Sequence, residues 1–338
     1  MPDFSIGVDL GGTNLRIAAI SKDGELLEKV TLGTKVAMGR DHVIGEMCDA
    51  IRRLSDQYRS GGSFLGAGIG VPGIIDMETG MLRKSANLPG WSDYPVHAEI
   101  ERRLGTRVFL ENDANVAALG EKWLGAARDV DNMAMVTLGT GIGGGIVLEG
   151  KIFHGMNGMS GEFGHITIEP DGVPCGCGNH GCAERYASAT AVVRMAREAI
   201  EAGHAPELAK AAASSAEFSA KDVYNLAIQG DDAAQRIFRR FGRALGMLLA
   251  DLVNVLNLEM YVIGGGVVSA WDAFARSMFE ELRERSLVYA ATDPEQPVGR
   301  EEGAAAQIIT RTRRKTIITR ALLGSDAGLF GAARIPAA

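Results

Sequence analysis

Residues 6–20 read IGVDLGGTNLRIAAI, in which an apolar segment precedes the turn Gly11-Gly12 and an alternating apolar segment follows it. This order predicts a β-hairpin closed by a glycine turn. The dinucleotide fingerprint and the P-loop both need a helix after the glycines, and the sequence contains no GxxxxGKS or GxxxxGKT motif. The hairpin can instead bring backbone N–H groups and the Thr13 hydroxyl to phosphate oxygens, with Asp9 as a carboxylate for a phosphate-bound magnesium ion.

A second stretch has the same organisation. Residues 135–147 read MVTLGTGIGGGIV, again an apolar segment, a glycine turn at Gly139-Thr140-Gly141 and another apolar segment. Duplicated hairpins predict two related domains that each direct a glycine turn toward one cleft, where a phosphate chain can be held. A third turn, Gly264-Gly265-Gly266, follows an apolar strand and precedes a helical stretch, so it offers backbone against which an adenine or ribose can lie, or it is an ordinary strand-to-helix connection.

The segment 165–184, HITIEPDGVPCGCGNHGCAE, contains Cys175, Cys177 and Cys182. Thiolates and imidazole at this spacing favour a tetrahedral zinc site with three cysteines and one histidine. A redox function fits less well, because a disulfide between Cys175 and Cys177 would be strained and the thioredoxin-like motif has two intervening residues. Spacing alone leaves His165 and His180 as alternatives for the fourth ligand.

Several carboxylates are candidates for chemistry. A strand is predicted at 107–110, directly before Glu111-Asn112-Asp113 and a helical pattern. A carboxylate at such a strand end can accept a proton from a substrate hydroxyl, and Asn112 can orient that hydroxyl; the alternative is an ordinary helix N-cap, which the local sequence favours. Glu162 and Glu184 flank the cysteine segment, where they can bind the hydroxyls of a sugar or remain solvated.

Composition limits the class of protein. A chain of 338 residues with 46% hydrophobic content is expected to form about two globular domains. We expect a cytoplasmic protein with no membrane partner, because no leader pattern and no apolar run of roughly 20 residues occurs. The net charge of −7 disfavours nucleic acid as a partner. The basic run Arg311, Arg313, Arg314 and Lys315 is expected to be a solvated face, and Cys48 to lie in a core.

Together these motifs resemble the ROK family of bacterial sugar kinases and sugar-responsive repressors. The resemblance rests on DLGGTNLR at 9–16, LENDAN at 110–115, TLGTGIGGG at 137–145, GEFGH at 161–165, CGCGNHGCAERYAS at 175–188 and GLFGAAR at 328–334. It covers essentially the whole chain. It implies an α/β, actin-like ATPase fold of the ribonuclease H type, with ATP and sugar in an interdomain cleft. The first domain would be 1–118 plus the C-terminal helix at 325–338, and the second, 119–324, would carry the zinc loop.

The resemblance also implies roles for individual residues. Asp113 would be the general base, and the hexose would be held by Asn87, Asn112, Asp113, Glu162, His165 and Glu184. His165 would complete the zinc site with Cys175, Cys177 and Cys182, leaving His180 as the second candidate. ATP and Mg²⁺ would be bound by Asp9, Gly11, Gly12, Thr13, Gly139, Thr140, Gly141, Gly265 and Gly266. Family members are often homodimers, so a homodimer is expected.

GVPGIID at 70–76 and SANLPGW at 85–91 resemble the glucokinase branch of the family, which implies phosphorylation of glucose at O6. N-acetylglucosamine and N-acetylmannosamine kinases share nearly all of these motifs and are the alternatives; fructose or allose kinases fit less well. A sugar-sensing repressor would need an N-terminal helix-turn-helix, for which the first strand, beginning by about Phe4, leaves no room. A non-catalytic zinc-stabilised scaffold is a third possibility and would not bind nucleotide.

Overall fold

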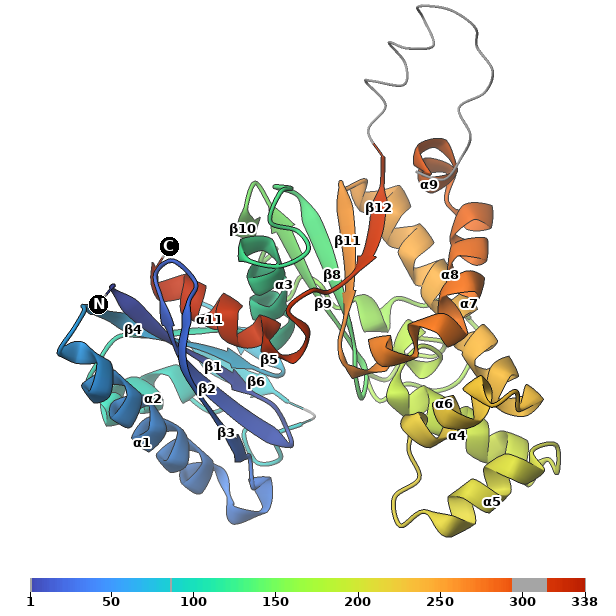
Figure 1. The fold of residues 1–338 in the computed structure, drawn as a ribbon, viewed down its shortest axis with the longest axis horizontal. Helices are drawn as coiled ribbons and strands as arrows, with labels where there is room; N and C mark the ends of the chain where they lie inside the picture. The colour runs from blue at the N-terminus through green and yellow to red at the C-terminus, as the bar shows by residue number, and fades with distance from the viewer. Residues whose placement is uncertain (1, 86, 294–314, 338) are drawn as a thin grey trace, which may run out of the picture. The chain divides into compact units, whose positions relative to one another are not determined.

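The computed structural model describes residues 2–85, 87–293 and 315–337, so Arg311, Arg313 and Arg314 lie outside the described residues. The chain divides into two compact units (Figure 1). The first unit comprises Met1–Met135, Gly144–Gly161 and Ala321–Ala338, and the second comprises Val136–Gly143 and Glu162–Arg320. Both the polypeptide's ends therefore belong to the first unit.

The first unit is built on a mixed five-stranded sheet in the order β3-β2-β1-β4-β7. Its strands are β1 (Phe4–Leu10), β2 (Asn14–Ser21), β3 (Leu26–Gly33), β4 (Phe64–Val71) and β7 (Val108–Asn112). β1 pairs antiparallel with β2 in register Leu10↔Leu15, which confirms the predicted hairpin, and β1 pairs parallel with β4. A short ribbon, β5 (Ile74–Asp76) with β6 (Met81–Lys84), leads to α2 (Val96–Leu104).

Different helices cover the two faces of this sheet. On one face, α1 (Arg40–Arg59) contributes the buried side chains of Val43, Met47 and Ile51 to the main core, together with Cys48 as expected. On the other face lies α11 (Ala327–Ala337), which also packs against α3 (Asp113–Trp123). The contact is close: a Cβ atom on Gly68 of β4 would stand 1.9 Å from the carbonyl oxygen of Ala332. Only glycine therefore allows the helix to lie directly on the strand.

The second five-stranded sheet has the order β10-β9-β8-β11-β12. Its strands are β8 (Met133–Leu138), β9 (Ile142–Leu148), β10 (Lys151–Ile152), β11 (Met260–Gly264) and β12 (Ile317–Arg320), and β11 pairs parallel with β12. In both sheets the strand order is third, second, first, fourth, fifth along the sequence. This shared topology agrees with the duplication predicted from the two glycine hairpins, and it gives an α/β fold with mixed sheets.

The α-helices described in the second unit are α4 (Ala189–Glu201), α5 (Pro206–Ser214), α6 (Ala220–Ile228), α7 (Asp232–Leu256), α8 (Trp271–Arg285) and α9 (Leu287–Thr292). The longest, α7, packs on α8 through buried aromatic rings, of which Phe241 and Phe274 have centroids 4.9 Å apart. α8 follows the third glycine turn through a short 3-10 helix, Gly266–Ala270, so the predicted strand, turn and helix are confirmed.

Candidate functional site

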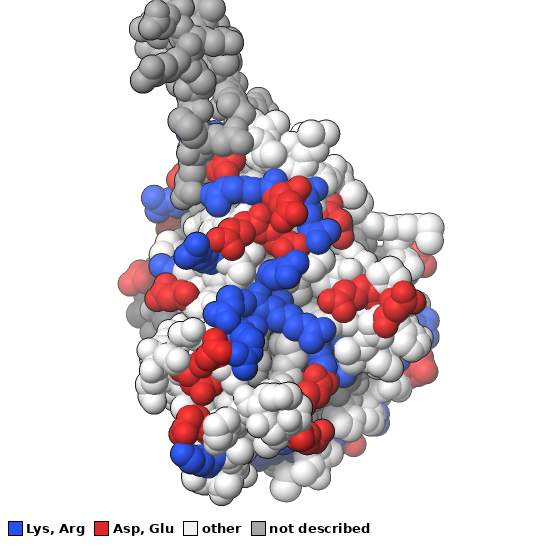
Figure 2. Space-filling model, turned by 90° about the vertical axis from the view of Figure 1, so that its right-hand side faces the viewer, with Lys and Arg blue, Asp and Glu red and all other residues white. Residues whose placement is uncertain are grey.

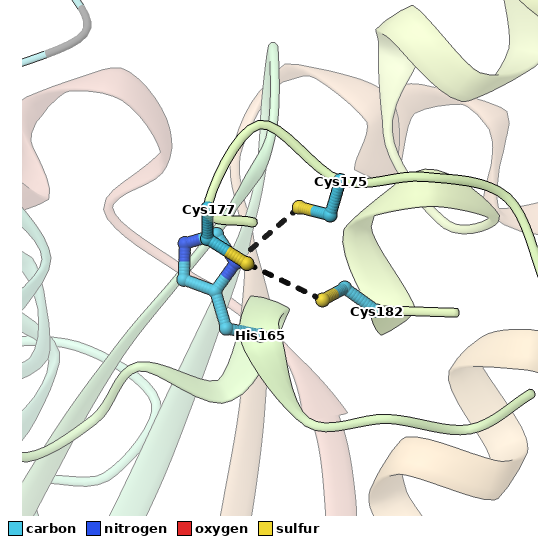
Figure 3. A group of neighbouring side chains, drawn as sticks. All are labelled: His165, Cys175, Cys177 and Cys182. Atoms are coloured by element: carbon cyan, nitrogen blue, oxygen red, sulfur yellow. Dashed lines mark hydrogen bonds between the residues drawn. The ribbon is translucent and has the colours of Figure 1, made fainter. Parts of the chain in front are cut away.

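The three cysteines and His165 of the second unit converge on one point (Figure 3). Their ligand atoms all lie within 4.8 Å of one another. The Sγ atoms of Cys177 and Cys182 are 3.7 Å apart, and the Sγ of Cys175 is 3.7 Å from Nδ1 of His165. Donors bound at 2.0–2.3 Å to one tetrahedral zinc ion stand roughly 4 Å apart, so both the donor set and its spacing fit zinc.

Short turns fix the cysteines in this arrangement. The N–H of Cys175 donates to the carbonyl of Asn179, and the N–H of Gly178 donates back to the carbonyl of Cys175. Pro174 forms a bridge with His180, whose side chain is exposed and does not belong to the cluster. Of the two histidines that sequence spacing could not distinguish, the structure therefore brings His165 to the sulfur atoms.

The thiols differ in their surroundings. Burial raises the pKa of Cys175 to about 12 and also raises the pKa of Cys182, whereas the backbone N–H of Asn179 lowers the pKa of the exposed Cys177. A thiol that resists ionisation is a poor nucleophile in disulfide exchange, so the raised pKa values of Cys175 and Cys182 argue against a reactive redox pair.

Tyr186 anchors the loop that carries Cys175, Cys177 and Cys182, called the metal loop below. This fully buried residue follows a short 3-10 helix, Ala183–Arg185, and its hydroxyl accepts the backbone N–H of Val173 at 2.7 Å. The chain of the metal loop thereby gains an anchor two residues before Cys175. The cysteine spacing alone gave no indication of this bond.

Two glutamates lie next to the metal ligands. Oε1 of Glu184 is 3.8 Å from Nδ1 of His165 and accepts the thiol of Cys175 at 3.2 Å, while Oε2 of Glu162 is 3.9 Å from Nε2 of His165. The imidazole thus turns one nitrogen toward the sulfur atoms and the other toward Glu162. The expectation that both glutamates flank the metal loop is met, and Glu162 is the more exposed of the two.

The turn Gly139-Thr140-Gly141 of the second unit also contacts Glu184. A Cβ atom on Gly141 would stand 2.6 Å from Oε2 of Glu184. The N-terminus of α4 reaches the same turn, because the N–H of Ala189 donates to the carbonyl of Gly139 and the hydroxyl of Thr190 to that of Thr140. The positive end of a helix dipole beside a glycine turn suits bound phosphate.

The third glycine turn adjoins this one. Gly265 has φ +88°, and a Cβ atom there would stand 2.4 Å from the carbonyl oxygen of Leu138, the residue before Gly139. Gly265 and Gly266 are both exposed. A cavity of about 540 Å³ begins at Thr140 and runs along α4 past Arg194 and Arg197 to Phe218.

The glycine turn of the first unit is open and lies against Asn87. A Cβ atom on Gly12 would be 3.2 Å from the carbonyl oxygen of Asn87, and both Asn87 and Thr13 are exposed. Nearby, Asp9 pairs with Arg16 at 3.0 Å; burial raises the pKa of Asp9 although Arg16 opposes that shift. Gly11 is held by Thr34, whose hydroxyl donates to the Gly11 carbonyl at 2.6 Å. Neither Arg16 nor Thr34 was among the predicted site residues.

The strand that precedes Asp113 ends two residues later than predicted. β7 runs through Asn112, and Asp113 is the first residue of α3, where its Oδ1 accepts the N–H of Ala114 at 3.0 Å. Asn112 is the N-cap, as the alternative interpretation held: its Oδ1 accepts the N–H groups of Ala114 and Asn115, and its Nδ2 donates to Gly73 at 3.1 Å. One amide hydrogen of Asn112 remains for another partner.

Charges outside these sites are mixed. Figure 2 shows Lys and Arg side chains in the middle of one face, with Asp and Glu side chains around and among them. On α7 and α8, Arg243 pairs with Glu281 at 2.9 Å and Arg276 with Glu280 at 2.8 Å. Paired charges of this kind differ from the unbroken basic stripe typical of a nucleic-acid surface. In the described part of the chain, every helix is too short or too polar to cross a membrane.

The duplicated mixed sheets, the glycine turns and the cluster of three cysteines and a histidine define an α/β protein consistent with the actin-like ATPase fold. The family model described as ROK family matches residues 5–336, so the chain belongs to the ROK family. It is similar to a glucokinase of Thermotoga maritima, with 40% identity over 98% of this chain and 96% of that protein.

Two further relatives are informative. An N-acetylmannosamine kinase of Yersinia pestis is 31% identical over 78% of this chain and 82% of that protein. The crystal structure of a ROK family glucokinase from Streptomyces griseus in complex with glucose and AMPPNP matches with a TM-score of 0.77 and 32% identity, covering 98% of each chain.

Proposed function

We propose that this chain is an ATP-dependent hexokinase that transfers the γ-phosphoryl group of Mg-ATP to O6 of glucose. The glucokinase of Thermotoga maritima, 40% identical over nearly the full length of both chains, supports this function. The N-acetylmannosamine kinase similarity supports an N-acetylhexosamine as the alternative substrate. A non-catalytic regulator is the less favoured alternative.

One contact carries the proposal. Gly141, in a turn suited to phosphate, lies directly against the carboxylate of Glu184, which we propose binds the hexose. Phosphoryl transfer requires the phosphate chain and the acceptor hydroxyl to be within bonding reach. A turn that binds phosphate, packed against a side chain that binds the sugar, meets this requirement.

We assign the nucleotide to the glycine turns. The backbone at Gly139, Thr140 and Gly141 would bind phosphate oxygens at the N-terminus of α4, and Gly265 with Gly266 would lie against the adenosine. Gly11, Gly12 and Thr13 would contribute the second phosphate turn. Asp9 fits a magnesium ion bound mainly through the phosphates, since such ions take one or two carboxylates from the protein. Bound magnesium would neutralise charge that develops on the phosphate oxygens.

Asp113 acts as general base in this mechanism. It removes the proton of the sugar hydroxyl as the new O–P bond forms in line with the breaking bond to ADP, and the proton then resides on the Asp113 carboxylate. Asn87, Asn112, Glu162, His165 and Glu184 hold the other hydroxyls. The second amide hydrogen of Asn112 can donate to one of them, because Oδ1 caps α3 and the first amide hydrogen donates to the carbonyl of Gly73.

Zinc has a structural part in this scheme. Bound by His165, Cys175, Cys177 and Cys182, it would fix the position of the His165 imidazole. Thiolate and imidazole donors match zinc rather than magnesium, so the two metals do not compete for one site. The cytoplasmic location and the homodimer stay predictions, the latter checked by light scattering of the purified protein.

The experiment that tests the function is ADP release with Mg-ATP and glucose, N-acetylglucosamine, N-acetylmannosamine, mannose, fructose or allose, compared by kcat/KM. We expect glucose to give the highest value. An N-acetylated sugar in first place would keep the mechanism and change the substrate; no stimulation by any sugar would overturn the kinase proposal.

Asp113→Asn tests the general base separately. We expect kcat to fall by about a hundredfold or more while glucose still binds, measured by calorimetry. The matched control is Asp129→Asn, because Asp129 is exposed and is not among the proposed site residues. Near-normal kcat for Asp113→Asn would contradict the assignment.

A further inference from the structure

Glu111 is a buried carboxylate whose oxygens are all engaged within the first unit. Only 4% of this residue is exposed. Oε1 accepts the backbone N–H of Asn112 and the Nδ2 of Asn115, both at 2.9 Å, and Oε2 lies 2.6 Å from Nε2 of His154. Hydrogen bonds accepted by an ionised carboxylate are charge-assisted and about twice as strong as neutral ones.

These bonds stabilise the turn from β7 into α3. Glu111 holds the N–H of Asn112 from the strand side and Asn115 from the helix side, and Asp113 lies between them in the sequence. The side chain of Asn112 caps the same helix. The direction of the Asp113 side chain therefore depends on the turn from β7 into α3, which the Glu111 carboxylate stabilises on both sides.

His154 is the imidazole partner of this carboxylate and also closes a loop. It follows β10, and its carbonyl accepts the N–H of Ser160 at 3.3 Å. Within the same loop, a Cβ atom on Gly158 would stand 2.6 Å from Cγ of Met77, so the loop packs on the ribbon β5–β6. The loop ends at Gly161, directly before Glu162 in the sequence.

We propose that His154 is a positioning residue for phosphoryl transfer: its imidazolium neutralises Glu111 and so keeps the turn that orients Asp113 in one conformation. This inference rests on the proposed kinase function. Loss of the cation leaves a buried charge without its counter-ion, which is a large local penalty that the turn can relieve only by rearranging. A displacement of about 1 Å at a reacting group can reduce the rate about a hundredfold.

The pairing of His154 with Glu111 also makes the stability of this turn depend on pH. The bond to Glu111 raises the pKa of His154 above its ordinary value of 6.5. A raised pKa of a cationic group in the folded state means that its stabilising contribution is complete below pH 6.5 and is lost as the pH rises through the raised value. Other charged or titratable side chains around the same cavity of about 480 Å³ are Glu78, His97, Glu101 and Arg107.

The test compares His154→Ala and His154→Gln with the exposed-residue control His204→Gln. Gln places a neutral N–H donor where Nε2 of His154 lies, and it cannot titrate. We expect His154→Ala to lower kcat by about ten- to a hundredfold with the KM for ATP changed less than about threefold. His154→Gln should recover part of kcat and lose the decline that wild type shows as His154 deprotonates.

Direct titration of the histidine provides a readout independent of turnover. In wild type, NMR of the His154 ring should give a pKa above 6.5, and Glu111→Gln should lower it. Equal kcat for wild type and folded His154→Ala would overturn the inference, as would an unchanged alkaline limb in His154→Gln. If wild type and His204→Gln both fail to turn over any sugar, the kinase function itself is wrong and the inference falls with it.

Discussion

Gly141 and Glu184 are in direct contact, and a single added carbon atom at Gly141 would stand 2.6 Å from the Glu184 carboxylate. The turn proposed to bind phosphate and the side chain proposed to bind sugar are thus parts of one packed structure. A change in either one must be transmitted to the other. The predictions below use contacts of this kind.

Gly141→Ala should impair both glucose binding and turnover. The new methyl group would displace Glu184, so we expect the KM for glucose to rise and kcat to fall, together by about ten- to a hundredfold in kcat/KM. Gly45→Ala in α1 is the control, because an added Cβ there meets no atom within 4 Å and Gly45 belongs to neither proposed binding site. Steady-state kinetics with glucose varied at saturating ATP checks this. A loss for Gly141→Ala no larger than that for Gly45→Ala would argue against the role of the Glu184 contact.

Metal removal should weaken sugar binding. We expect one zinc ion per chain, and Cys177→Ser should lose it together with much of the affinity for glucose, because His165 loses its fixed position. Elemental analysis and calorimetry measure the two quantities. Cys48→Ala is the control: it removes a buried thiol of the first unit that lies outside the cluster, and metal content should stay at that of wild type. Retention of both metal and full activity in Cys177→Ser would refute the link.

Glu121→Ala should destabilise the fold strongly. This fully buried carboxylate of α3 accepts the backbone N–H groups of Ala126, Leu322 and Leu323. Buried donors left without an acceptor cost about 1–3 kcal/mol each, so we expect a loss of about 3–5 kcal/mol in the free energy of unfolding. Urea denaturation gives the value. The control is Glu280→Ala, whose exposed ion pair with Arg276 is worth at most about 1 kcal/mol.

Asp9→Asn should lose kinase activity and gain stability. Because burial raises the pKa of Asp9, the folded state binds its proton more tightly than the unfolded chain does. Ionised Asp9 therefore reduces stability, and the reduction sets in as the pH rises from the ordinary Asp value through the raised one. We expect Asp9→Asn to gain stability relative to wild type at pH 7, with the gain shrinking toward pH 3, while kinase activity is lost. Thermal unfolding of both proteins across this pH range is the measurement.

Local patterns in the sequence were sufficient for much of this structure. The hairpin around Gly11 and the cluster of Cys175, Cys177 and Cys182 depend on residues close together in the chain, where alternation and spacing carry the information. The capping of α3 by Asn112 could likewise be stated in advance as an alternative, because an N-cap is a one-turn feature.

Contacts between distant residues were not predictable in this way. His154 and Glu111 are separated by 43 positions, and Glu121 and Leu322 by 201, and neither pair leaves a periodic trace in the sequence. Each involves an acidic residue that appears ordinary by local pattern, since a buried carboxylate is recognised only by what surrounds it. The resemblance to a family indicated which residues bind the substrates. The hydrogen bonds that hold the surrounding backbone in place became visible only in the structure.

The position of α11 has a consequence for biosynthesis. The helix that covers β1 and β4 is formed by residues 327–337, whereas both strands lie within residues 4–71. Until α11 has left the ribosome, the sheet surface at Gly7 and Gly68 has no cover. The strands must therefore wait for a helix that is translated much later before their own core can close, and a nascent chain truncated before residue 327 should remain protease-sensitive in its N-terminal half.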